Sequence, residues 1–461
     1  MKSISCSSVN SRLGSRSRYA GTANLQDILG VTKILPHGHA VAMNHQHFFH
    51  PVTKNNKRLR MNLNILSHQK NLIIKFTLIV AAATALSAAP AEEERRDNDR
   101  DRERERVILS FSTVGDSRQD PVTPDPTTVP LSGQDAIWLE NTKALERIRR
   151  SVEIQRSSFL FFNGDMIMGY GNAIVPANNN TVEGIVNSDL VQFYRQYAFW
   201  RGMMAGLMEA GTYVVPVPGN HETEWKAGGK KAQVANENAW RANMGDLIFD
   251  NARFQTLFGE QPGFEDVTNN PALDGLTSDQ TQLSYSFDFR GCHFAVINTD
   301  PVGNDSHAPV HWLSSDLAAA QARGAQQFFV FGHKPAFTYS YGVTNPLPTK
   351  PSGLDNDIAS RDAFWNVIEQ YQATYFCGHE HIYHVEQPTV AQGGKAWQVL
   401  VGSGGSPFEA IPTDFTLNPA TDRAYAWATV KVYASGKVGI TVLGFDDQFG
   451  PTRVLRSIIL R

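Results

Sequence analysis

Short apolar runs recur along the chain, and each run ends in a cluster of small and polar residues. The runs cover residues 107–114, 159–162, 213–217, 327–331, 374–377 and 399–401. Short continuous apolar runs are typical of strands that are buried on both faces of a sheet. We therefore predict a strand at each of these positions, followed by a loop that begins in the polar cluster.

Segments with the spacing of amphipathic helices lie between these runs, at residues 135–150, 190–209, 310–323 and 360–371. Because strands and helices alternate, we predict an α/β fold in which helices cover a pair of mixed sheets. Two hairpins are also expected, one across residues 283–298 and one across residues 424–443. The remaining long segments are predicted to be loops around the mouth of a site, at residues 172–187, 226–236 and 259–279.

The first 106 residues do not follow this pattern, and the folded domain is expected to cover residues 107–461. Residues 1–60 are polar and irregular, and we interpret them as a disordered or non-native leader that precedes a natural start at Met61. Residues 92–106 are almost all charged with mixed signs, which predicts a solvated linker.

Residues 61–91 have the layout of a secretory signal peptide. Lysines precede a short apolar core, and Ala89-Pro90-Ala91 offers a cleavage site. The alternative is an N-terminal membrane anchor, but the apolar core is short for a span of about 20 residues. We therefore expect a secreted or periplasmic protein without a stable membrane span after cleavage.

The composition is that of a globular protein, with 41% hydrophobic and 19% charged residues. A formal net charge of -3 gives no reason to expect nucleic acid or an anionic membrane as a partner. Cys292 and Cys377 fit either a disulfide bond or two buried thiols. His293, which follows Cys292, is expected to pack inside its strand.

Polar residues after glycine at successive strand ends are the candidates for chemistry. They are Asp116, Asp165, Asn220, His221, His333, His379 and His381. The ends of parallel strands lie on one edge of a sheet, so these side chains are expected to converge. A mixed set of nitrogen and oxygen donors suits Zn, Mn or Fe ions rather than Ca ions.

These candidates belong to five short blocks that are ordered along the chain. The blocks are Gly115-Asp116-Ser117-Arg118, Gly164-Asp165, Gly219-Asn220-His221-Glu222, Gly332-His333 and Gly378-His379-Glu380-His381. In this order they resemble the blocks of the calcineurin-like metallophosphoesterases, especially of the purple-acid-phosphatase-like branch. The resemblance covers roughly residues 107–443, and it implies a four-layer αββα sandwich of two mixed sheets flanked by helices.

The resemblance also implies a metallophosphoesterase that hydrolyses phosphate mono- or diesters of a small substrate by attack of metal hydroxide. Two divalent or trivalent ions (Mn, Zn or Fe) would be the cofactors. The implied ligands are Asp165, which would bridge both ions, Asp116 and His381 at the first ion, and Asn220, His333 and His379 at the second. His221 would donate a hydrogen bond or proton to the leaving oxygen, and Glu222 would orient His221.

Two positions depart from the family pattern. A histidine that would ligate the first ion is replaced by Arg118, and a tyrosine of the purple branch is replaced by Met168, with Tyr170 two residues later. Arginine stays protonated and cannot ligate a metal, so Arg118 is expected to hold a phosphate oxygen or to form a structural ion pair. We expect a weak first site; the alternative is a non-catalytic or mononuclear degenerate binding protein with this fold.

Overall fold

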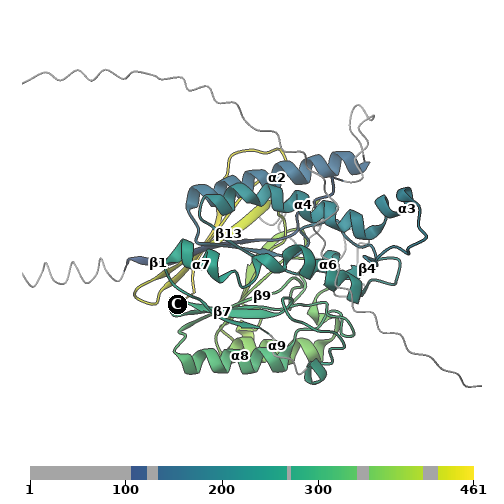
Figure 1. Ribbon diagram of the computed structural model, residues 1–461. Helices are drawn as coiled ribbons and strands as arrows, with labels where there is room; N and C mark the ends of the chain where they lie inside the picture. The colour runs from purple at the N-terminus through teal and green to yellow at the C-terminus, as the bar shows by residue number, and fades with distance from the viewer. Residues whose placement is uncertain (1–104, 122–132, 267–270, 340–351, 409–423, 461) are drawn as a thin grey trace, which may run out of the picture. The chain divides into compact units, whose positions relative to one another are not determined.

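A computed structural model describes residues 105–121, 133–266, 271–339, 352–408 and 424–460 (Figure 1). The predicted leader and signal peptide, and nearly all of the charged linker, lie outside the described residues. Within the described part, none of the helices combines the length and the apolar character that a membrane crossing requires.

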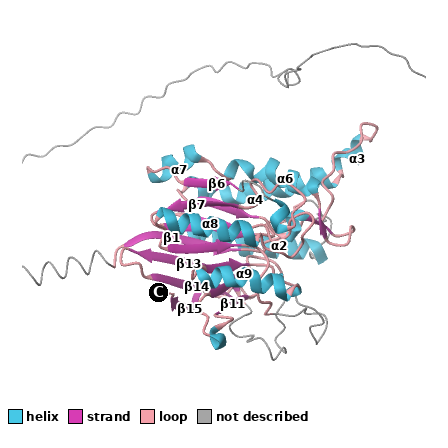
Figure 2. Cartoon of the chain, turned by 90° about the horizontal axis from the view of Figure 1, so that it is seen from below, coloured by secondary structure: helices cyan, strands magenta, loops and turns pink. Residues whose placement is uncertain are grey.

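Two mixed β-sheets lie at the centre of the described part (Figures 1 and 2). The first sheet has the strand order β15-β14-β13-β1-β2-β3, and the second has the order β11-β12-β10-β9-β8-β7-β6. The first contains β1 (Val107–Val114), β2 (Phe159–Asn163), β3 (Tyr213–Val217), β13 (Tyr425–Tyr433), β14 (Val438–Phe445) and β15 (Arg453–Ile459). The second contains β6 (Gly263–Asp266), β7 (Tyr285–Phe289), β8 (Cys292–Val296), β9 (Gln327–Phe331), β10 (Thr374–Cys377), β11 (Tyr383–Glu386) and β12 (Trp397–Val401).

Helices cover the outer face of each sheet, α2 and α4 on the first and α8 and α9 on the second (Figure 1). The helices are α2 (Gly133–Gln155), α3 (Val182–Val186), α4 (Asp189–Glu209), α5 (Asn220–Thr223), α6 (Val234–Met244), α7 (Asn251–Phe258), α8 (Val310–Arg323) and α9 (Ile358–Gln370). Trp200 of α4 packs edge-on against Phe162 of β2, with ring centroids 5.2 Å apart. The arrangement is the four-layer αββα sandwich that was predicted, so the predicted fold class is confirmed.

Aromatic side chains fill the space between the two sheets. Phe161 of β2 stacks on Phe331 of β9, with centroids 3.7 Å apart and an interplanar angle of 5°. Phe111 of β1 makes edge contacts with Phe294 of β8 and Phe376 of β10, at 5.6 and 5.9 Å. Aromatic pairs of this kind add about 0.5–1.5 kcal/mol each to the effect of burial. This core therefore fixes the two sheets against each other and fixes the strand ends that carry the polar blocks.

The apolar runs predicted the central strands well. The predicted bounds of β1, β3, β9, β10 and α8 agree with the structure. β11 and β15 were not predicted, because β15 exposes most of its side chains and has no continuous apolar run. The three segments predicted as loops contain short elements, namely α3, β5 (Lys231–Ala232) and β6, and β5 pairs with β4 (Glu224–Trp225), which directly precedes its segment.

The two cysteines of the described part do not pair. Cys292 is buried between the sheets, and Cys377 is buried in the apolar cluster beneath α8 and α9. Of the two alternatives from the sequence, the structure has two buried thiols.

His293 is buried, as expected, but it has charged partners rather than a purely packing role. Its Nδ1 lies 2.6 Å from Oδ1 of Asp288, and its Nε2 lies 2.8 Å from Oδ2 of Asp316 on α8. Burial alone would lower the pKa of His293, but the two carboxylates outweigh burial and raise the pKa above its usual value. The folded state therefore favours the imidazolium form, which joins β7, β8 and α8.

Replacing His293 should destabilise the protein in a pH-dependent way. A raised folded-state pKa gives stability that is fully present below the ordinary pKa of about 6.5 and is lost as pH rises through the folded-state pKa. We expect His293→Asn to lower the free energy of unfolding by about 3 kcal/mol near pH 6 and by less near pH 9. Urea unfolding at both pH values measures this, with exposed His311→Asn as the control. A loss for His293→Asn that is the same at both pH values would contradict the ionic role.

Candidate metal centre

The loops after the parallel strands β1, β2, β3, β9 and β10 bring the predicted donor side chains together. The six predicted ligands are Asp116, Asp165, Asn220, His333, His379 and His381, one or two from each loop. All of them are buried except His379, which is half-buried. Backbone hydrogen bonds tie the loops to one another within each sheet, for example Asp116 N to Gly164 O (3.0 Å), and across the two sheets, for example Gly115 N to Val401 O (2.9 Å).

Three donor atoms lie close to Nε2 of His333. Nε2 of His333 lies 2.8 Å from Oδ1 of Asn220, 3.2 Å from Oδ1 of Asp165 and 3.2 Å from Nδ1 of His379. Nδ1 of His379 also lies 3.1 Å from Oδ1 of Asn220. Donors bound to a zinc-sized ion at about 2.0–2.1 Å are separated from one another by roughly 3.0–3.4 Å. These four distances are close to the spacing of donors that share a transition-metal ion.

A second group of donors borders the first and shares Asp165 with it. Asp116, Asp165 and His333 each have a donor atom within 4.8 Å of the others. Nε2 of His381 lies 3.8 Å from Oδ1 of Asp116. Asp116 thus lies beside His381, and a carboxylate oxygen of Asp165 lies within 4.8 Å of donor atoms of Asp116 and His333.

Backbone carbonyls orient two of the histidines. Nδ1 of His333 lies 2.7 Å from the carbonyl oxygen of Asn163, and Nδ1 of His381 lies 2.7 Å from the carbonyl oxygen of Pro407. A proton on each Nδ1 satisfies these contacts and leaves each Nε2 free to face the carboxylates. Partners of this kind fix the tautomer of histidines that bind metals.

The backbone at the centre is held in conformations that L-residues rarely adopt. Asp116, Asp165 and His379 have φ values of 64°, 52° and 72°, in the left-handed region. Such residues cost about 1–3 kcal/mol each and cluster at functional sites. Glycine is required beside them, since a Cβ on Gly164 would lie 2.5 Å from Nδ1 of His333, and one on Gly378 would overlap the carboxylate of Asp116.

The electrostatics of the cluster favour a bound cation. Burial raises the pKa of Asp116 well above its usual value, and the charge of Asp165 adds to this rise. Burial alone would lower the pKa of His333, but the carboxylates of Asp165 and Asp116 raise it to about 10. A proton on His333 thus balances part of the buried negative charge. A metal cation would balance it more fully, so the residues present fit a metal site.

His221 lies beside the carboxylates, but Glu222 does not orient its ring. Nε2 of His221 lies 3.5 Å from Oδ2 of Asp165, and its Nδ1 contacts the carbonyl oxygen of Met168. The carboxylate of Glu222 instead accepts hydrogen bonds from the backbone N–H groups of Asp165 and Met166, at 2.9 and 2.8 Å. The expected orienting role therefore belongs to Met168, and Glu222 holds the turn that carries Asp165.

Arg118 lies next to His381. Its Nε donates to Oγ of Ser406 (2.9 Å), and one terminal nitrogen lies 3.2 Å from Nδ1 of His381. Among the described residues, no carboxylate forms an ion pair with Arg118. The structural ion pair that was one of two expectations is therefore not seen there, and the guanidinium remains beside the cluster.

Tyr170 belongs to the centre, although sequence reasoning assigned it no role. Its ring lies over His221, with centroids 3.8 Å apart, and its hydroxyl oxygen accepts a hydrogen bond from Nδ2 of Asn220. Tyr170 itself has a φ of 63°. Its place two residues after Met168 was the signal in the sequence, but the direction of its side chain depends on this unusual backbone conformation.

A buried lysine cluster behind the centre was also missed. The ammonium of Lys334 donates to Asp300, to Oε1 of Glu224 (3.3 Å) and to Oγ of Ser306 (2.9 Å). Burial and the nearby charge of Asp300 raise the pKa of Glu224 to about 7. Because Lys334 directly follows His333, this cluster anchors the loop after β9.

Comparisons with known proteins gave structural neighbours only, since no family model and no curated protein matched the chain. One neighbour is a purple acid phosphatase from yellow lupin (Lupinus luteus) seeds, with a TM-score of 0.46 and 12% identity, which covers 76% of this chain and 53% of the neighbour. A dimetal phosphatase from Danio rerio has a TM-score of 0.43 and 12% identity over 76% of this chain and 99% of the neighbour. TT1561 of Thermus thermophilus has a TM-score of 0.33 and 11% identity over 76% of this chain and 100% of the neighbour.

These neighbours belong to the calcineurin-like metallophosphoesterase superfamily, which is the family that the five blocks of the sequence resemble. The chain spans about half the length of the lupin phosphatase.

Metal binding should stabilise the protein through Asp165. A ligand that binds only the folded state stabilises it by about 2.7 kcal/mol at 100 times its Kd. Addition of Mn²⁺ or Zn²⁺ to protein stripped by a chelator should therefore raise the melting temperature, whereas Asp165→Asn should lose most of the rise and bind less metal per chain. Glu183→Gln, an exposed change on α3, is the control. An equal rise of the melting temperature in Asp165→Asn and in Glu183→Gln would exclude Asp165 as a ligand of the metal.

Proposed function

We propose that this chain is a metal-dependent phosphoesterase that hydrolyses phosphate mono- or diesters of a small substrate. The observation that carries the proposal is the convergence of donor atoms from five loops that lie far apart in the sequence. Nitrogen and oxygen donors in this mixture suit Mn, Zn or Fe ions. The carboxylates of Asp116 and Asp165 and the amide of Asn220 can help to hold two such ions.

The proposed ligands follow the two groups of side chains. Asp165 would contact both ions, Asp116 and His381 would hold one, and Asn220 and two histidines of the other group would hold the second. When bound, the ions would lower the pKa of a water molecule and offset the charge of the phosphate. The protein supplies a buried frame for this chemistry, because backbone groups contact four of the donor side chains, namely Asp116, Asp165, His333 and His381.

His221 is proposed to assist the leaving oxygen. Burial lowers its pKa to about 4, so the ring is neutral at neutral pH in the absence of substrate. The negative charge of a bound phosphate ester would raise this pKa and favour a proton on Nε2, since an opposite charge nearby stabilises the cation. With Nδ1 held by Met168, Nε2 is the atom that can donate to the leaving group.

Arg118 is proposed to hold a phosphate oxygen. Its guanidinium lies beside His381 and is anchored by Ser406. A guanidinium can form two parallel hydrogen bonds to a phosphate and stays charged in all conditions. In this proposal, Arg118 supplies a positive charge at the position where the family pattern has a further metal ligand.

The alternative function is a non-catalytic or mononuclear binding protein with the same fold. Arg118 and Met168 favour it, because neither position supplies a ligand to the first ion. The position of His221 beside Asp165 favours the enzyme, since a binding protein needs no proton donor there. We further propose, from the signal pattern in residues 61–91, that the enzyme is secreted or periplasmic.

Hydrolysis of model esters tests the proposed function. The metal-stripped protein, reconstituted with Mn, Zn or Fe, should hydrolyse p-nitrophenyl phosphate or its bis-nitrophenyl diester. Asp165→Asn should lower kcat at least about 100-fold, since the residue is placed to hold both metal ions. Metal bound per chain without turnover of either ester would favour the binding protein, and turnover by Asp165→Asn at the wild-type rate would contradict the site.

The role of His221 predicts a dependence on the leaving group. A good leaving group needs no proton, so His221→Ala should lower kcat/KM for an alkyl phosphate much more than for p-nitrophenyl phosphate, by about 10-fold or more. His311→Ala, at an exposed position of α8, provides a control for loss of an imidazole. Equal losses on both esters in His221→Ala would show that the residue does not act as the acid.

A further inference from the structure

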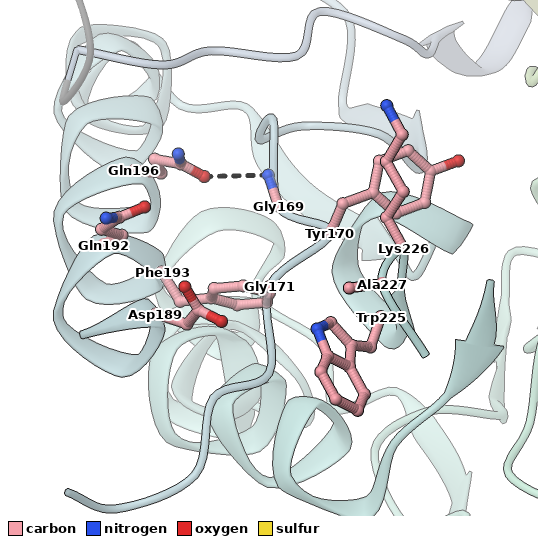
Figure 3. Close-up of a pocket in the computed structure, with 10 residues that line it drawn as sticks. All are labelled: Gly169, Tyr170, Gly171, Asp189, Gln192, Phe193, Gln196, Trp225, Lys226 and Ala227. Atoms are coloured by element: carbon pink, nitrogen blue, oxygen red, sulfur yellow. Dashed lines mark hydrogen bonds between the residues drawn. The ribbon is translucent and has the colours of Figure 1, made fainter. Parts of the chain in front are cut away.

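A cavity of about 420 Å³ lies beside the candidate metal centre, between α4 and the hairpin of β4 and β5 (Figure 3). Tyr170 lines this cavity, and the same residue lies over His221 and contacts Asn220. The backbone N–H of Lys226 donates to the carbonyl oxygen of Tyr170 (3.0 Å), which joins the hairpin to this segment. Tyr170 therefore borders both the cavity and the metal centre.

Flat apolar surfaces form part of the cavity. Phe193 of α4 is buried at its base, and the half-buried indole of Trp225 forms the opposite side. In Figure 3 the space lies between the α4 side chains and this indole. Rings stack favourably on such surfaces, so the walls suit a planar group of the substrate.

The polar groups of the cavity that remain available to a ligand are mainly hydrogen-bond acceptors. Gln196 is already engaged, because its Oε1 accepts from Gly169 N (2.9 Å) and its Nε2 donates to Asp120 (3.0 Å). Asp189 accepts from Asn172 N through Oδ2 (2.6 Å). Among the described residues, no donor contacts Oδ1 of Asp189. A carboxylate oxygen at the edge of a flat apolar pocket selects a group that carries N–H donors.

Gln192 and Lys226 are two further polar side chains that line the cavity. Gln192 donates through Nε2 to Asn187 O (3.3 Å), which leaves Oε1 as a second acceptor on the same side as Asp189. In Figure 3 the ammonium of Lys226 lies beside the ring of Tyr170, away from Asp189. The positive charge and the acceptors thus stand apart within the cavity, so the cavity favours a ligand with an anionic end and an N–H donor end.

We propose that this cavity receives the leaving group of the substrate, and that this group is a ring that bears an amino group, of the size of an aminated nucleobase. The inference rests on the proposed function for the position of the phosphate. The ring stacks on Trp225, its amino group donates to Asp189 and Gln192, and Lys226 lies on the phosphate side. The cavity volume is large for a small alkyl amine.

Paired substrates that differ in one amino group test the proposal. The values of kcat/KM are compared for adenosine monophosphate, for inosine monophosphate, which has a carbonyl oxygen in place of the amino group, and for phosphoethanolamine and p-nitrophenyl phosphate. We expect a preference of about 10-fold or more for adenosine over inosine monophosphate, because a carbonyl oxygen in place of the amino group leaves the acceptor of Asp189 without a donor. Asp189→Asn should lose most of this preference and lower kcat/KM for adenosine monophosphate more than for p-nitrophenyl phosphate, which carries no amino group.

Asp189→Asn keeps an oxygen for Asn172 N, and Glu183→Gln serves as the matched control because it removes a nearby exposed carboxylate that does not line the cavity. Equal rates for the two nucleotides in the wild type would overturn the proposal, as would a preference for phosphoethanolamine over adenosine monophosphate. If Asp189→Asn lowered kcat/KM equally for all of the esters, Asp189 would have a structural role instead.

Direct binding separates this inference from the proposed function. If no ester is turned over, p-nitrophenyl phosphate included, the proposed function fails, and calorimetric titration with the two nucleotides still tests the cavity. Tighter binding of adenosine than of inosine monophosphate, lost in Asp189→Asn, would support the cavity as a binding site in its own right. Equal affinities would overturn it.

Discussion

The side-by-side burial of Asp116 and Asp165 is the interaction on which the rest of the structure depends. Removing a carboxylate from water costs several kcal/mol unless a positive charge or hydrogen bonds offset the loss. Here the backbone N–H of His379 donates to Asp116, and His333, with its pKa raised to about 10, contacts Asp165. The close spacing of the donors in this cluster would also suit a metal cation as a partner for the two carboxylates.

The fold holds this costly arrangement in place through backbone geometry. The left-handed conformation of Asp165 is stabilised by Glu222, whose carboxylate accepts four backbone N–H groups around the turn, and the turn follows a strand that is fixed by the aromatic core between the sheets. Glu222 directly follows His221, and its carboxylate stabilises the strained turn at Asp165 rather than the imidazole ring of His221. The strained residues of one sheet thus depend on the packing of both sheets.

Most of the fold and the donor set could be predicted from the sequence, because both depend on local patterns. Buried strands have apolar runs, and ligands follow glycine at their ends, so Asp116 and His333 stood out without any structure. The role of Glu222 and the position of Tyr170 could not be predicted, since they depend on which backbone groups a side chain meets after the chain turns through positive φ. The edge strand β15 was missed for a related reason, because its exposed side chains leave no apolar signal.

The segment around Tyr170 borders both the metal centre and the cavity, and it shows what a departure from the family pattern can do. Met168 supplies no ligand through its side chain, but its carbonyl oxygen orients His221, a task that depends on backbone position alone. Tyr170 then places its hydroxyl on Asn220 and its ring on His221, while its backbone binds Lys226 of the hairpin. A segment without a metal ligand can therefore position both His221, the proposed proton donor, and the wall of the cavity that we propose for the leaving group.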